Sequence, residues 1–144
     1  MTLFLLLALA MGTAPDSGAS MAGKSNTALV REARQAYDRG EKALFLSLYE
    51  ELARRRPGDV AVLYNLACGQ SINGRGDAAV RTLENLLAHR VASNLDGDTD
   101  FESIRQTEGY RRVAARMNEL RQERISSGAE RAFTIPEKGL VAEG

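Results

Sequence analysis

Cysteine occurs once in the sequence, and this scarcity limits the chemistry of the chain. Cys68 has no second cysteine with which to form an intramolecular disulfide or to share a zinc ion. It lies in the segment Leu-Ala-Cys-Gly, where small side chains permit close helix packing. We therefore expect a buried structural thiol rather than a reactive one.

Histidine is equally scarce, so the commonest general base is nearly absent. The single histidine, His89, stands beside Arg90 at the end of an expected helix, without an indicated serine or cysteine partner. The segment Gly74-Arg75-Gly76 lacks the preceding strand and the following Gly-Lys-Ser/Thr of a phosphate loop. We predict no catalytic residue, no metal ligand and no cofactor, and hence a protein that is not an enzyme.

An excess of charge of one sign is also missing. Lys and Arg together number 19 of the 144 residues, as do Asp and Glu. No net field therefore favours nucleic acid or an anionic membrane. The three prolines fall outside the expected helix interiors, and alanine and leucine dominate. The length allows one domain with a modest core, and the composition predicts an all-α fold.

The sequence does contain an internal repeat. Shifting the chain against itself by 34 residues aligns six identical pairs: Leu29 with Leu63, Ala33 with Ala67, Gly40 with Gly74, Glu50 with Glu84, Leu52 with Leu86 and Arg56 with Arg90. This is a period of helical-hairpin repeats. Residues 26–57 and 58–91 are therefore predicted to form two helical hairpins.

Apolar spacing indicates where the helices of each copy lie. In the first copy we expect helices over 27–39 and 42–55, with Asn26 or Thr27 as the first cap and Pro57 as the stop. Glycines in the turns should end the first helix of each copy. The positions expected to shape and pack the repeats are Leu29, Ala33, Gly40, Phe45, Leu63, Leu66, Ala67, Gly74, Ala79 and Leu83.

The second copy resembles the tetratricopeptide repeat family. Residues at the large, medium and small apolar positions of that family's pattern are Leu63, Leu66, Ala67, Ala79 and Leu83. Departures from the pattern occur at Gln70, Leu86 and Val91, and at Phe45 in the first copy. The resemblance implies a short right-handed superhelix of helical hairpins, closed by a C-terminal capping helix pair. It also implies that the first helices form an inner surface for a protein or peptide.

An acidic segment follows the repeats. Residues 96–100 carry aspartates at alternate positions, as a calcium loop does. The calcium template fails, because Phe101 and Thr107 stand where it requires Gly and Glu. We favour a capping box in which Thr99 and Glu102 start a short helix.

The region 98–125 is predicted to cap the stack. Helices are expected near 100–106 and 108–124, and no 34-residue echo of the repeats is evident there. A terminal unit of this kind covers the open apolar end and shows a polar outer face. The arginines of this region alternate with glutamates, which indicates a solvated face rather than a nucleic-acid stripe; they are Arg111, Arg112, Arg116, Arg121 and Arg124.

The two ends of the chain differ from the repeats. Residues 1–25 open with the apolar run 3–11, too short to span a bilayer, and continue with small residues typical of a signal-peptide cleavage site. No Lys or Arg precedes the run, so a disordered leader on a cytoplasmic domain is the alternative to export. Residues 126–144 are expected to be extended or disordered. Their last ten residues resemble the entry to a β-propeller of the gluconolactonase and senescence-marker type.

These features lead to a functional expectation. The chain is predicted to be an adaptor or scaffold that binds a protein or peptide, exported to the periplasm or secreted if the leader is a signal peptide. No nucleic acid and no stable membrane span are expected, and the oligomeric state stays open. Residues proposed on the inner surface are Arg34, Asn65, Gln70 and Asn73. The alternative is an N-terminal accessory domain of a truncated β-propeller protein of the lactonase type.

Overall fold

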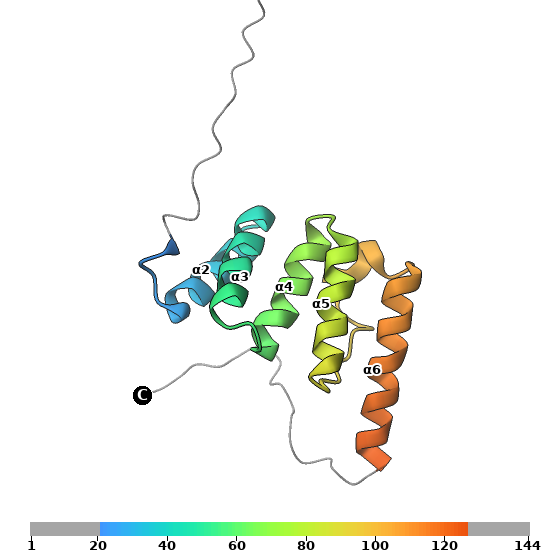
Figure 1. Cartoon of the computed structure of the whole chain (residues 1–144). Helices are drawn as coiled ribbons and strands as arrows, with labels where there is room; N and C mark the ends of the chain where they lie inside the picture. Colours follow the sequence, from blue (N-terminus) through green and yellow to red (C-terminus); the bar gives the residue numbers. More distant parts are fainter. Residues whose placement is uncertain (1–20, 127–144) are drawn as a thin grey trace, which may run out of the picture.

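A computed structural model describes residues 21–126, which are all-α (Figure 1). The elements are α2 (Asn26–Asp38), α3 (Lys42–Arg55), α4 (Val60–Ile72), α5 (Gly76–Ala88), the short 3-10 helix η1 (Thr99–Ile104) and α6 (Glu108–Ser126). Within these residues no helix is both long and apolar enough to cross a membrane. The predicted fold class is confirmed.

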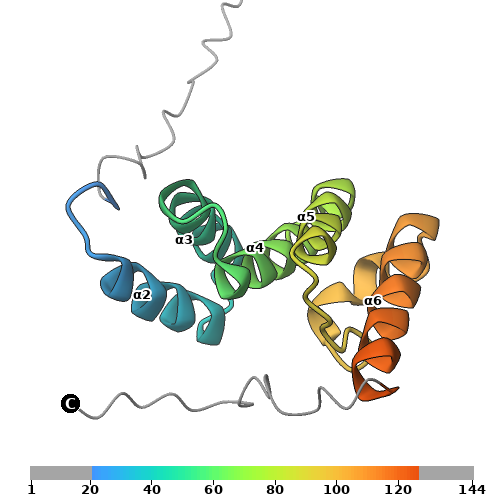
Figure 2. The same cartoon turned by 60° about the horizontal axis from the view of Figure 1, so that its bottom comes forward.

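The helices form a repeat-like stack of hairpins. In each repeat the two helices pack together, α2 on α3 and α4 on α5. Between units, α3 packs on α4, α4 on η1 and α5 on α6, so the chain advances from α2 at one end to α6 at the other (Figure 2). The capping pair is present as η1 and α6. Its first helix is a single short 3-10 segment rather than the helix expected near 100–106.

The core runs through the whole stack. Of the positions expected to pack the repeats, Phe45 and Leu63 are each only 4 % exposed and Leu66 is half-buried. The remaining apolar ones are fully buried: Leu29, Ala33, Ala67, Ala79 and Leu83. The capping pair adds Phe101, Ile104, Val113 and Met117 to the same cluster. The units therefore share one continuous core, as a stack requires when a single hairpin cannot bury its apolar face alone.

The turns inside the two repeats are closed by glycine. Gly40 has φ 72° and Gly74 has φ 75°, the left-handed region that costs glycine least. The N–H of Gly40 donates to the carbonyl of Tyr37, and the following N–H reaches the carbonyl of Ala36. The same pair of hydrogen bonds follows α4 and satisfies carbonyls that its last turn leaves open.

Two helix starts differ from the prediction. Helix α2 is capped by Ser25, whose hydroxyl accepts from the N–H of Ala28 at 3.2 Å, one residue before the expected cap. At η1 the cap is Asp98, whose carboxylate accepts from the N–H of Asp100 at 2.9 Å. The expected capping box starting at Thr99 is therefore wrong. The carboxylate of Asp98, one residue earlier, already accepts from a free N–H of the first turn.

The folded part begins before residue 26. Met21 is 5 % exposed and belongs to the core, although residues 21–25 were assigned to the leader. Arg55 holds this segment, donating to the carbonyl of Met21 at 2.8 Å and to that of Lys24 at 2.6 Å. Residues 1–20 and 127–144 lie outside the described residues. The signal peptide, the export it implies and the propeller-like tail stay predictions.

Candidate binding surface

Each repeat presents an equivalent row of side chains on its first helix. On α2 the row is Val30, Arg34 and Tyr37, spaced so that all three share one face. We call this set the α2 row. Residues 34 positions later form the α4 row, which consists of Tyr64, Cys68 and Ser71. The structure treats these two rows differently.

The α4 row is covered by the chain itself. The hydroxyl of Tyr64 donates to Oδ2 of Asp98 at 2.5 Å. The thiol of Cys68 lies 3.9 Å from the same oxygen. One turn further along, the hydroxyls of Ser71 and Ser103 are 3.3 Å apart. The segment 98–103 therefore lies over the α4 row.

The covering segment is fixed by contacts with the cap. The guanidinium of Arg105 donates to the carbonyls of Asp96 and Asp98, both at 2.9 Å. The hydroxyl of Tyr110 donates to the carbonyl of Leu95 at 3.0 Å, and the Leu95 side chain is buried. Hydrogen bonds to its backbone carbonyls and the buried Leu95 side chain fix this acidic segment in place. The segment is therefore a structural part of the domain.

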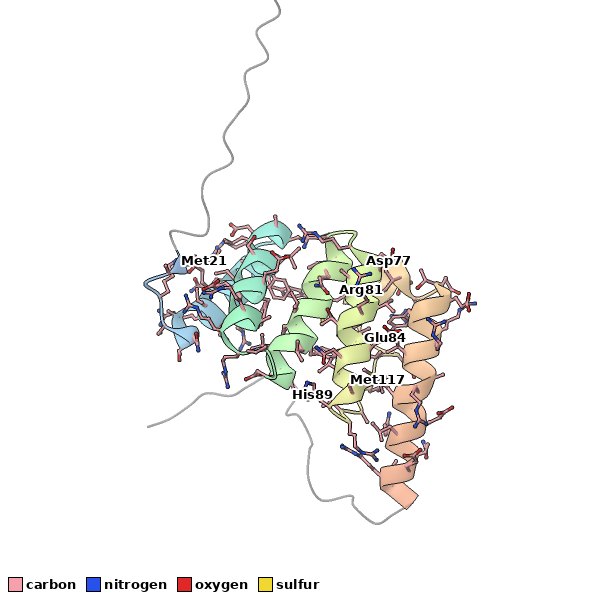
Figure 3. All side chains as sticks on the ribbon, viewed as in Figure 1. Met21, Asp77, Arg81, Glu84, His89 and Met117 are labelled. Atoms are coloured by element: carbon pink, nitrogen blue, oxygen red, sulfur yellow. The ribbon has the colours of Figure 1, made fainter. Side chains whose placement is uncertain are left out.

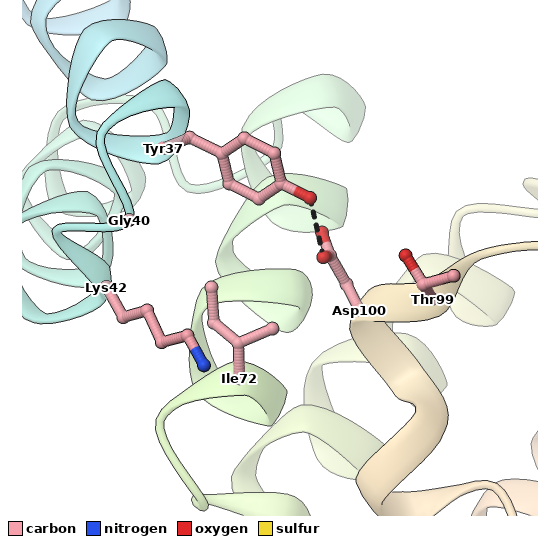
Figure 4. Close-up of a pocket in the computed structure, with 6 residues that line it drawn as sticks. All are labelled: Tyr37, Gly40, Lys42, Ile72, Thr99 and Asp100. Atoms are coloured by element: carbon pink, nitrogen blue, oxygen red, sulfur yellow. Dashed lines mark hydrogen bonds between the residues drawn. The ribbon is translucent and has the colours of Figure 1, made fainter.

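The α2 row, in contrast, is open. Val30 is 42 % exposed and Tyr37 is 45 % exposed, and Arg34 is exposed as well. The row makes one contact with the covering segment. The Tyr37 hydroxyl donates to Oδ1 of Asp100 at 2.7 Å (Figure 4). This hydrogen bond is the main reason why the pKa of Tyr37 lies above its ordinary value, and partial burial raises the pKa further.

A hollow lies at the end of the α2 row. Its volume is about 370 Å³, and Figure 4 shows the Ile72 side chain between Lys42 and the bonded pair of Tyr37 and Asp100. Gly40 and Thr99 complete the lining. The hollow combines an apolar wall with one ammonium and one carboxylate, so it suits an amphiphilic side chain better than a purely apolar one.

The covered thiol has a perturbed titration. Burial first, and then the carboxylates of Asp98 and Asp100, raise the pKa of the Cys68 thiol above its ordinary value. Burial and the bond to Asp98 act on Tyr64 in the same direction, raising the pKa of its hydroxyl. Both groups therefore stay protonated at neutral pH, and a protonated buried thiol is a poor nucleophile.

Cys68, Asp98 and Asp100 bring potential metal-ligand atoms within 4.8 Å of one another. The sequence gives no sign of this cluster, because Cys68 and Asp98 are 30 residues apart. Asp98 and Asp100 each accept a tyrosine hydroxyl, from Tyr64 and Tyr37 respectively. Hydrogen bonding therefore accounts for the arrangement.

The structure separates the four residues proposed to contact a partner. Arg34 is exposed on the α2 row, and Asn65 donates to the carbonyl of Ala61 within its own helix at 2.8 Å. The amides of the other two connect helices. Thr82 of α5 donates to Gln70 at 2.8 Å, and Asn73 donates to the carbonyl of Lys42, at the start of α3, at 2.9 Å. Contact of these residues with a partner stays a prediction.

Comparisons of the chain with known protein families, with curated proteins and with solved structures find no match. The tetratricopeptide resemblance therefore rests on the repeat pattern quoted above, and the all-α stack on the structure.

The outer helices carry a different surface. Figure 3 shows Asp77, Arg81 and Glu84 on α5, with His89 at its end. His89 is the exposed C-cap residue of α5. On α6, Arg116 lies 2.7 Å from Glu119, which fits the expected solvated face of alternating charges. Arg81 is exposed in mid-helix, which makes it a suitable control position for changes on the α2 row.

Proposed function

We propose that this chain is a non-enzymatic adaptor that binds a protein or peptide on the inner surface of tetratricopeptide-like hairpins. The observation that carries the proposal is the contrast between the two rows. The α4 row is covered by residues 98–103, whereas Val30 and Tyr37 of the α2 row are 42 % and 45 % exposed. Apolar side chains exposed beside a hollow that has an apolar wall and two charged groups are a feature of recognition surfaces.

The stack favours binding of an extended segment. Hairpins that repeat along one direction present equivalent side chains at regular intervals, so a segment laid across them meets several at once. Among residues 21–126 that surface includes the exposed α2 row and the hollow lined by Lys42 and Ile72. The alternative role, as an accessory domain of a propeller protein, depends on residues 127–144, outside the described part.

Site-directed crosslinking tests the proposal. A photoreactive benzoylphenylalanine at the Val30 position, in the full chain expressed in its native host, should form a covalent adduct with a specific protein. The same group at the Arg81 position, exposed on α5, should not. Excess unmodified chain should compete away the adduct, and a Val30→Glu chain should fail to compete. Equal adducts from both positions would count against a binding surface on α2.

A further inference from the structure

The α2 row is one of the most apolar exposed features of the described residues. Three large apolar side chains are exposed within residues 21–126, and two of them, Val30 and Tyr37, belong to this row. The third, Ile125, lies far along the sequence near the end of α6. Val30 itself is 42 % exposed.

Two arginines beside these apolar side chains have no partner among residues 21–126. Arg31 and Arg34 are exposed and make no ion pair or hydrogen bond within residues 21–126. The neighbouring cations are engaged: Lys24 lies 2.6 Å from Glu32, and Arg39 lies 2.8 Å from Glu41. Among residues 21–126, the middle of α2 therefore offers two unpaired guanidinium groups beside Val30.

The C-terminal end of α2 carries charges of both signs. Asp38 is exposed at the end of the helix, and the carboxylate of Asp100 lies against the Tyr37 hydroxyl. An acidic residue bound over Arg31 and Arg34 gains from both guanidinium groups, whereas one placed beyond Tyr37 meets the carboxylates of Asp38 and Asp100 as well as the ammonium of Lys42. The cationic charge is therefore less opposed over Arg31 and Arg34, which specifies where the carboxylates of a partner should lie.

We propose that the α2 row, together with Arg31, binds an extended segment of another protein in which acidic residues flank an apolar side chain. The segment's carboxylates pair with Arg31 and Arg34 in the bidentate geometry that guanidinium favours. Its apolar side chain packs on Val30 and on the ring of Tyr37. On α4, the equivalent helix of the second repeat, a carboxylate of the chain itself already occupies the row, because Asp98 accepts the hydroxyl of Tyr64. This inference rests on the proposed function and adds the chemistry of the partner.

Fluorescence anisotropy with three labelled peptides tests the chemistry directly. The acidic probe copies residues 94–102, Asn-Leu-Asp-Gly-Asp-Thr-Asp-Phe-Glu, an acidic and apolar segment. The neutral probe replaces each Asp by Asn and the Glu by Gln, and the basic probe replaces these residues by Lys. We expect the full chain to bind the acidic probe at least about tenfold more tightly than either counterpart, and to lose that preference as salt rises.

Matched variants locate the effect. The double variant Arg31→Glu with Arg34→Glu should weaken binding of the acidic probe at least about tenfold, whereas Arg81→Glu should leave it within about twofold. Circular dichroism of each variant checks that the helices are intact. Equal affinity for the acidic and neutral probes, no binding of the acidic probe, or no effect of the double variant would overturn the inference.

Two further outcomes separate this inference from alternative occupants of the α2 row. If the neutral or basic probe binds best, and Val30→Glu abolishes that binding, the α2 row binds peptides but its preference for acidic segments is wrong. Light scattering after size exclusion tests a second copy of the chain as the occupant. A dimer that Arg34→Glu dissociates would show that the row is a self-association surface and would overturn the proposal of an acidic partner.

Discussion

The hydroxyl of Tyr64 donates to the carboxylate of Asp98 at 2.5 Å, and Asp98 lies one repeat length of 34 residues further along the chain. The bond joins α4, the first helix of the second repeat, to the segment that follows α5. In that segment the short η1 stands where a third repeat would have its first helix. Asp98 also caps η1 through the N–H of Asp100. One carboxylate thus closes the α4 row and starts the capping pair.

Removing the Tyr64 hydroxyl should destabilise the domain. Tyr64→Phe leaves the ring in place but deprives a partly buried carboxylate of a hydrogen bond, so the free energy of unfolding should fall by about 1–3 kcal/mol. Tyr49→Phe is the matched control, because Tyr49 is 7 % exposed and its hydroxyl has no hydrogen bond within residues 21–126. Urea denaturation measures both. Equal losses would show that the bond to Asp98 contributes nothing specific.

The repeat and its turns could be predicted because their signals are local. A 34-residue period, apolar spacing at helical intervals and glycine after α2 and α4 each depend on residues close in sequence, and the hairpins and the positive φ of Gly40 and Gly74 follow from them. The observed α2 begins and ends one residue before the expected helix over 27–39. Serine and asparagine are both good N-cap residues, so the sequence alone does not decide between Ser25 and Asn26 as the cap.

The covered surface could not be predicted in the same way. Tyr37 and Asp100 are 63 residues apart, and whether they meet depends on the path of the segment after α5. That path is set by Arg105 and Tyr110, which hold backbone carbonyls and leave no pattern in the sequence. A register signal did exist, because Asp98 stands 34 positions after Tyr64. Apart from this register, the repeats alone give no sign that residues 98–103 cover the α4 row.

Arg90 adopts a conformation that glycine would adopt at lower cost. Its φ is 55°, and its N–H closes α5 on the carbonyl of Leu87 as Gly40 closes α2. Arg90→Gly should raise the free energy of unfolding by about 0.5–1 kcal/mol, the relief of left-handed strain less the added freedom of the unfolded chain. The carbonyl that accepts from Arg124 is retained.

The control for this change is Arg81→Gly. Arg81 lies in the interior of α5 and is exposed, so glycine there should lower the free energy of unfolding by about 1 kcal/mol. Thermal or urea unfolding should therefore show a higher free energy of unfolding for Arg90→Gly and a lower one for Arg81→Gly. A loss of stability in both would show that Arg90 is not strained.

Cys68 should make the domain less stable in alkali. Its thiol pKa is raised in the folded state by burial and by two carboxylates, so the unfolded chain releases this proton at a lower pH than the folded one. The stabilisation is therefore complete below the unfolded pKa of about 8.5 and is lost above it, by up to about 1.4 kcal/mol per pH unit. Urea denaturation from pH 8 to 9.5 measures the slope, which Cys68→Ala should remove over that range. An unchanged slope in the variant would contradict the assignment to the thiol.

Arg55 should hold the segment that precedes α2. Its guanidinium donates to the carbonyls of Met21 and Lys24, and its Nε lies 2.7 Å from Glu51. Lysine cannot reproduce this planar set of donors, so Arg55→Lys should lower the free energy of unfolding by about 1–3 kcal/mol and speed hydrogen exchange before α2. Arg54→Lys is the matched control, because Arg54 pairs with the same glutamate but its side chain is 70 % exposed, where ion pairs contribute little. Faster exchange in both variants, or in neither, would show that another contact holds Met21 in the core.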